Sequence, residues 1–138
     1  MAHHIHEMIN THPKGVQENV DVLVSCIQAC FDCEQTCTSC ADACLAEDNV
    51  SNLRLCIRLN LDCADICGTT GRVLSRQTET DWALVRSMLE VCKRACRKCG
   101  DECERHGKMH EHCRVCAEFC ERCEKECRRL LNALSTAS

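Results

Sequence analysis

Cysteine accounts for 18 of the 138 residues and falls in four blocks. Within each block the spacing alternates between four and three residues, and Asn60 stands where the second block would carry a further cysteine. Thiolates are soft ligands that select Cu(I), zinc or iron–sulfur clusters. The pattern therefore predicts metal binding by Cys26, Cys30, Cys33, Cys37, Cys40 and Cys44; Cys56, Cys63 and Cys67; Cys92, Cys96, Cys99 and Cys103; and Cys113, Cys116, Cys120, Cys123 and Cys127.

The same spacing indicates which elements carry these thiols. An alternation of four and three residues follows one face of an α-helix, whereas a strand would send its cysteines to both faces. We expect helices over about residues 13–48, 51–75, 78–107 and 108–134, with Pro13 in a first turn, a capping box of Thr78 and Asp81, and Gly107 as a helix end. Short links predict an all-α fold: an up-down-up-down antiparallel four-helix bundle with an inward-facing cysteine core.

This bundle is expected to be a single domain of residues 14–138 that follows a histidine-rich tail of residues 1–13. At one end the helices bring Cys44, Cys56, Cys103 and Cys113 together. At the other end the stripes continue as an apolar plug. The plug residues are Val16, Leu23, Leu74, Trp82, Val85, Leu89, Leu130, Leu131 and Leu134. A thiol-lined interior closed at one end is typical of a container.

Composition excludes several classes of function. Acidic and basic residues are intermixed with a net charge of -4, so we expect no nucleic-acid partner. No apolar run is long enough to cross a bilayer, and the first residues lack the pattern of a secretion signal. We therefore expect a cytoplasmic protein without a membrane partner, and a reducing cytosol favours metal ligation over disulfides.

Charge and geometry distinguish among the metals that thiolates bind. A zinc ion held by four thiolates leaves a net charge of about -2 to be compensated in a narrow core, whereas one Cu(I) per thiolate is neutral. Iron–sulfur clusters are usually held by loops rather than by long helices. A zinc or cadmium buffer of metallothionein type stays open as the alternative. A thiol redox enzyme would need one reactive cysteine, and nothing distinguishes one thiol from the others, so we expect no enzymatic activity.

The four cysteine blocks resemble those of the bacterial copper storage proteins, in particular the cytosolic type, and the resemblance covers essentially the whole chain. It implies a four-helix bundle whose inward cysteines bind many Cu(I) ions per chain, for storage and for protection against copper toxicity. It also implies a homotetramer. The partners that donate or receive the copper are not indicated.

Residues other than cysteine are expected to assist the metal. Asn60 is either a ligand or a buried hydrogen-bonding residue that fixes helix register. His106, Met109 and His110 lie at the thiol end, and imidazole and thioether suit the capture of Cu(I) before it passes inward. In the family that the chain resembles, His and Met residues at the open end play such a part. His112 is given less weight.

Two further segments carry weaker signals. His3, His4, His6 and His12 are expected to lie in a solvated tail. The segment of residues 51–75 is apolar on nearly every side: Leu53, Ile57 and Leu61 lie on one flank of its cysteine stripe, and Leu55, Leu59 and Ile66 lie on the other. Such a helix is buried on more than its core side, so we expect it to form an oligomer interface.

Overall fold

The computed structural model describes residues 3–15 and 18–137. Their fold is all-α, and no strand occurs among them. Five α-helices and one short 3-10 helix follow in the order α1 (His3–Asn10), α2 (Val20–Leu45), η1 (Val50–Leu53), α3 (Arg54–Ser75), α4 (Trp82–His106) and α5 (Glu111–Ala137). None of the helices in the described ranges combines the length and hydropathy that crossing a bilayer demands.

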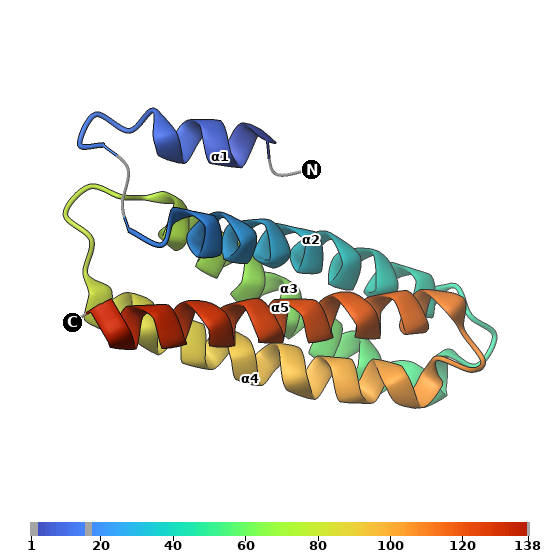
Figure 1. Cartoon of the computed structure of the whole chain (residues 1–138). Helices are drawn as coiled ribbons and strands as arrows, with labels where there is room; N and C mark the ends of the chain where they lie inside the picture. Colours follow the sequence, from blue (N-terminus) through green and yellow to red (C-terminus); the bar gives the residue numbers. More distant parts are fainter. Residues whose placement is uncertain (1–2, 16–17, 138) are drawn as a thin grey trace.

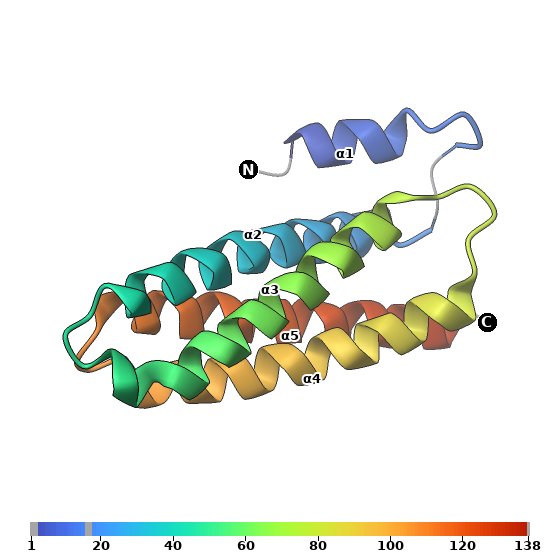
Figure 2. The ribbon, with the colours of Figure 1, turned by 180° about the vertical axis from the view of Figure 1, so that it is seen from behind.

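The four long helices lie side by side, as Figures 1 and 2 show from opposite directions. α2 packs mainly against α3 and α5, and α4 packs mainly against the same two helices. The α2–α3 and α4–α5 connections meet at one end, which we call the mouth. The start of α2 and the α3–α4 connection lie at the other end, near the carboxyl terminus. Consecutive long helices therefore run in opposite directions.

The amino-terminal residues form a helix rather than the solvated tail that their histidines suggested. α1 packs along α2 and buries Ile5 and Ile9, which are 7% and 5% exposed. His6 Nε2 lies 3.5 Å from Asp21 Oδ1. Ile5 and Ile9 are four positions apart, so they share one helix face and bind α1 to the bundle through apolar contact.

Several helix ends differ from those expected. α2 begins at Val20 and not near Pro13, because Gly15 (φ 89°) and Asn19 (φ 63°) adopt left-handed backbone conformations that no helix continues through. The predicted capping box at Thr78 is wrong. Asp81 is itself the N-cap of α4, and its carboxylate accepts a hydrogen bond from the Leu84 backbone N–H at 3.1 Å.

Two predictions about helix ends and packing are confirmed. α4 ends at His106, and Gly107 is its C-cap, with a backbone N–H that donates to the Glu104 carbonyl. The end away from the mouth is an apolar plug, with Leu23, Leu74, Val85, Leu89, Leu130 and Leu134 buried and Trp82 and Leu131 half-buried. Val16, expected in the same plug, lies outside the described residues.

Close packing of α2 on α3 depends on two glycines. A Cβ atom at Gly71 would lie 2.9 Å from the Phe31 ring, and one at Gly68 would overlap the Glu34 carboxylate. These positions let the two helix backbones approach so that their cysteine stripes meet in the interior.

Candidate metal centre

All eighteen cysteines are buried, with exposed fractions of 0% to 1%, and none forms a disulfide. They come from α2, α3, α4 and α5, so the interior between the four long helices is lined with sulfur. Buried polar or charged residues in the described chain are few: Asn60, Thr70, Gln77, Glu102 and His110. No buried lysine or arginine accompanies the thiols in the described ranges.

Sulfur atoms from different helices lie within contact distance along the interior. Cys67 Sγ is 3.5 Å from Cys96 Sγ on the neighbouring helix, and Cys56 Sγ is 3.6 Å from Cys103 Sγ. Several sets of four have all sulfurs within 4.8 Å of one another. They include Cys30, Cys92, Cys123 and Cys127; Cys33, Cys63, Cys67 and Cys96; Cys33, Cys37, Cys63 and Cys120; Cys37, Cys99, Cys116 and Cys120; and Cys40, Cys44, Cys56 and Cys113.

These sets overlap. Cys33 belongs to at least two of them, as do Cys37, Cys63 and Cys120. A thiolate in two sets is placed to bridge two soft ions, which is how sulfur ligands join neighbouring metal sites into clusters. The arrangement suits many ions in contact better than a few isolated tetrahedral sites.

The pKa values of the thiols differ from one position to another. Hydrogen bonding with Cys127 lowers the pKa of Cys26 to about 6, and hydrogen bonding with Cys103 lowers the pKa of Cys56 to about 7. Burial raises the pKa of Cys44 well above its ordinary value. Since the thiolate is the metal-binding form, an entering cation displaces the protons that the neighbouring thiols hold.

Asn60 occupies the gap in the second cysteine stripe and is fully buried. Its Oδ1 accepts hydrogen bonds from Cys99, Cys116 and Cys103 at 3.0, 3.1 and 3.4 Å, and its Nδ2 donates to Cys56 Sγ at 3.7 Å. In the metal-free protein Asn60 is thus a hydrogen-bonding hub. Deprotonation of these three thiols would leave the oxygen without its hydrogen-bond donors.

The histidines predicted at the mouth are held by carboxylates. His106 Nε2 lies 3.0 Å from Glu102 Oε2, and His110 Nδ1 lies 3.0 Å from Glu47 Oε2. His110 is 9% exposed, and its Nε2 is buried without a hydrogen-bond partner. Met109 is 76% exposed, so its thioether faces solvent beside the mouth.

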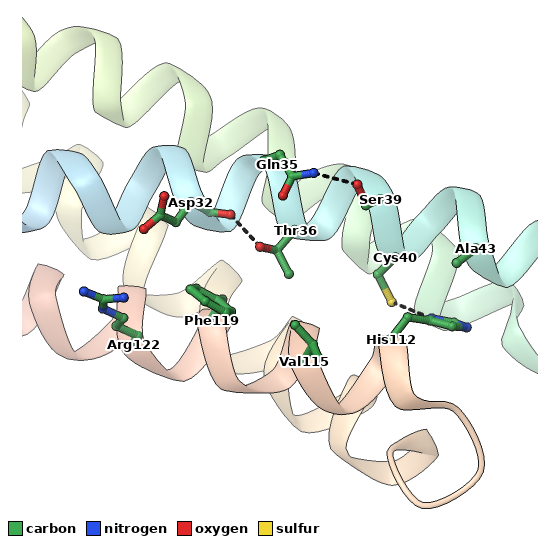
Figure 3. Close-up of a pocket in the computed structure, with 10 residues that line it drawn as sticks. All are labelled: Asp32, Gln35, Thr36, Ser39, Cys40, Ala43, His112, Val115, Phe119 and Arg122. Carbon is green, nitrogen blue, oxygen red and sulfur yellow. Dashed lines mark hydrogen bonds between the residues drawn. The ribbon is translucent and has the colours of Figure 1, made fainter. Parts of the chain in front are cut away.

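The sequence led us to expect a smaller role for His112 than for the other histidines near the mouth, yet its imidazole contacts the thiols directly. Its Nδ1 lies 3.4 Å from Cys40 Sγ and 3.6 Å from Cys113 Sγ, as Figure 3 shows for Cys40. The spacing drew attention to Met109, which continues the stripe of Cys113. The overlooked signal is that His112 is four residues before Cys116, on the flank of the same helix face.

Glu47 orients this imidazole. Its Oε2 lies 2.8 Å from His112 Nε2, and the rings of His110 and His112 stack with centroids 5.6 Å apart. The hydrogen bond with His112 lowers the pKa of Glu47. Burial alone would lower the pKa of His112, but hydrogen bonds with Cys40 and Glu47 raise it above its ordinary value. A carboxylate on one ring nitrogen directs the other toward a metal.

A groove of about 680 Å³ runs between α2 and α5 and reaches Cys40 and His112 (Figure 3). Its α2 wall includes Asp32, Thr36 and Ser39, and its α5 wall includes Val115, Phe119 and Arg122. We call it the α2–α5 groove.

Known proteins resemble this chain over most of its length. The model of the family described as "Copper storage protein" matches residues 19–132. The uncharacterized cysteine-rich protein YhjQ of Bacillus subtilis (strain 168) is 37% identical over 106 residues, which cover 77% of this chain and 93% of that protein.

Solved structures of copper storage proteins are also similar to this chain. The copper storage protein Ccsp from Streptomyces lividans, loaded with 10 copper equivalents, is 46% identical with a TM-score of 0.91, over 93% of this chain and 98% of its own. The Cu(I)-bound copper storage protein BsCsp3 is 38% identical with a TM-score of 0.67, over 75% of this chain and 92% of its own. With a cysteine core of this kind and these matches, the chain belongs to the copper storage protein family.

Proposed function

We propose that this protein stores copper by binding many Cu(I) ions through the thiolates of its interior, so that it buffers the metal and protects the cell from it. The observation that carries the proposal is the set of eighteen buried thiols, most of which lie in groups of four, with sulfurs shared between several of the groups. Its family and the copper-loaded relatives support the identity of the metal.

Charge favours Cu(I) over zinc. Each Cu(I) neutralises one thiolate, whereas tetrahedral zinc sites would leave excess negative charge in the interior. No buried lysine or arginine in the described chain stands ready to compensate it. A zinc or cadmium buffer of metallothionein type is therefore the weaker alternative.

In this proposal α2–α5 act as an up-down-up-down antiparallel four-helix bundle with an inward-facing cysteine core. All eighteen cysteines are ligands. His106, Met109, His110 and His112 assist the first capture of copper at the mouth, and Asn60 contributes its oxygen once the surrounding thiols are deprotonated. These roles are supported by His110 Nε2, which is buried without a hydrogen-bond partner, and by His112 Nδ1, which contacts Cys40 Sγ.

The copper is cargo, and the protein carries out no turnover. We place it in the cytoplasm, where thiols stay reduced; a related Streptomyces lividans protein is described as a cytosolic copper storage protein. Assembly as a homotetramer is part of the proposal. It is supported by Leu55 and Leu61 of α3, which are 53% and 48% exposed although they are large and apolar.

The test is an anaerobic titration of the fully reduced apo-protein with Cu(I) against a chromophoric Cu(I) chelator, with a parallel zinc titration. A break near the cysteine count of 18 before the chelator colours is the expected result. A break after only about four ions, together with tighter zinc binding, would overturn the proposal in favour of isolated tetrahedral sites.

A further inference from the structure

We propose that the α2–α5 groove binds a small zwitterionic thiol that carries Cu(I) and delivers it to Cys40 from the side of the bundle. This inference rests on the proposed storage function, because it names the chemical form in which the copper arrives. Three features of the groove carry it: a soft ligand pair at one end, paired charges at the other, and a matching length.

The inner end of the groove presents metal ligands. Cys40 Sγ and His112 Nδ1 are 3.4 Å apart, and both residues line the groove. Cys40 is itself buried, and its sulfur meets a nitrogen of His112 next to an open concave surface (Figure 3). Copper that reaches this point need not pass the loops at the mouth.

The outer end presents one charge of each sign. Asp32 on α2 and Arg122 on α5 flank the groove on the side away from Cys40 (Figure 3). Asp32 Oδ1 accepts a hydrogen bond from Gln28 Nε2 at 2.8 Å, which leaves Oδ2 available. Arg122 is exposed and makes no ion pair within the described chain. An α-amino-acid group, with its ammonium on Asp32 and its carboxylate on Arg122, complements this pair.

The dimensions fit a molecule the size of a tripeptide. Arg122 and His112 are ten positions apart on α5, so about 15 Å of helix separates them. A tripeptide spans up to about 11 Å, and the arginine side chain reaches over the remainder. The volume of about 680 Å³ lies within the usual range of small-molecule sites. Val115 and Phe119 supply an apolar floor between the ends.

Transfer is a ligand exchange without change of oxidation state. The Cys40 sulfur forms a bond to Cu(I), the bond between copper and the carrier sulfur breaks, and the proton shared by Cys40 and His112 passes to the departing carrier thiolate. The products are a Cu(I)–thiolate of Cys40 and a free carrier thiol. His112 Nδ1 supplies a nitrogen ligand while the copper changes partners.

The experiment measures the rate of copper uptake against the concentration of a preformed Cu(I)–glutathione complex. The rate is followed under anaerobic conditions by the sulfur-to-copper charge-transfer absorbance. A binding site predicts that the rate saturates. Arg122→Glu should raise the half-saturation concentration about tenfold, as expected for the loss of one charge-assisted hydrogen bond. The Cu(I) complex of glutathione diester, which lacks the free carboxylates, should show a similarly raised half-saturation concentration on the wild-type protein.

Matched controls separate docking from general effects. Arg129→Glu makes the same charge change on α5 outside the groove and should leave the half-saturation concentration unchanged. Ser39→Trp fills the groove and should slow uptake from Cu(I)–glutathione, whereas Thr38→Trp, on an exposed position outside the groove, should not. Uptake of acetonitrile-stabilised Cu(I) should be the same in all four variants.

A rate that stays linear with complex concentration overturns the inference, as does equal behaviour of Arg122→Glu and Arg129→Glu. The final copper capacity, measured on the same samples, distinguishes a failure of the groove proposal from a failure of the storage function. Full capacity with insensitive rates rejects the groove alone. A capacity of a few ions in the wild-type protein rejects the storage function itself.

Discussion

Glu47 and His112 share a hydrogen bond of 2.8 Å between Oε2 and Nε2, although 65 residues separate them in the chain. The same carboxylate oxygen lies 3.0 Å from His110 Nδ1. Glu47, two residues beyond the end of α2, thereby occupies Nε2 of His112 and Nδ1 of His110, which leaves Nδ1 of His112 and Nε2 of His110 as the nitrogens that could meet a metal. Under the proposed function, Glu47 is a positioning residue for the capture of the first ions.

Replacing Glu47 should therefore weaken the binding of the first ions without changing the amount stored. Loss of such a carboxylate typically weakens metal binding by about 10- to 100-fold. We expect Glu47→Gln to lower the affinity for the first ions by this factor while the final copper capacity stays at the wild-type value. Competition with a Cu(I) chelator at low copper loading measures the effect. Glu111→Gln, an exposed carboxylate paired with Arg114, is the control. Equal losses in both variants would contradict a specific role of Glu47.

Asn60→Cys should complete the cysteine stripe of α3. The substitution puts a sulfur among Cys56, Cys99, Cys103 and Cys116, and we expect the copper capacity to rise by about one ion, since each thiolate neutralises one Cu(I). Asn60→Ala should leave the capacity near the wild-type value. It should destabilise the apo-protein by about 1–3 kcal/mol, because buried thiols lose their acceptor. Copper titration and thermal unfolding check the two outcomes, and an unchanged capacity of Asn60→Cys would count against inward thiol ligation at this position.

Copper loading should weaken as the pH falls. Protons and Cu(I) compete for the same sulfurs, so acidification favours the protonated, metal-free form. The pKa of Cys26 is lowered to about 6, so this thiol is largely ionised at pH 7 and protonated at pH 5. Burial keeps Cys44 protonated at both values. We expect more protons released per copper at pH 5 than at pH 7, measured in weakly buffered anaerobic titrations. A release independent of pH would contradict this linkage.

The exposed leucines of α3 should hold the subunits together. Leu55→Glu with Leu61→Glu places charges on the proposed interface, and we expect the assembly to dissociate in sedimentation velocity experiments. Leu45→Glu, at the end of α2 and 62% exposed, serves as the control and should leave the assembly intact. Sedimentation of the double variant at the same rate as the wild-type protein would exclude this face of α3 as the contact.

α1 should detach when its apolar anchor is shortened. Ile9→Ala shortens a buried side chain, a change that typically costs about 2–5 kcal/mol in a protein core. A helix as short as α1 is not stable on its own, so this loss should be enough to release it from the bundle. We expect faster amide exchange over residues 3–10 with no change in copper capacity. Met8→Ala, at a position 70% exposed, should leave the exchange unaltered. Slow exchange in both variants would mean that contacts other than Ile9 hold α1.

The sequence predicts the part of the fold that depends on periodicity. The cysteine spacing follows helical geometry, so the stripes, the long helices and the apolar plug can be derived from it. What depends on tertiary contact cannot be derived in this way. α1 was not predicted because its three histidines obscured the Ile5 and Ile9 pair. His112 was underrated because its role depends on Cys40 of α2 and on Glu47, which the sequence places far from it.

The sharing of sulfurs between neighbouring groups of four has a consequence for the order in which ions move. Because Cys33, Cys37, Cys63 and Cys120 each belong to two groups, an ion can step along the interior by exchanging one sulfur at a time. The plug of Leu74, Leu89 and Leu130 closes the far end. We therefore expect the ions loaded last to be the first withdrawn. Sequential loading with two stable copper isotopes would show this order in the copper that leaves.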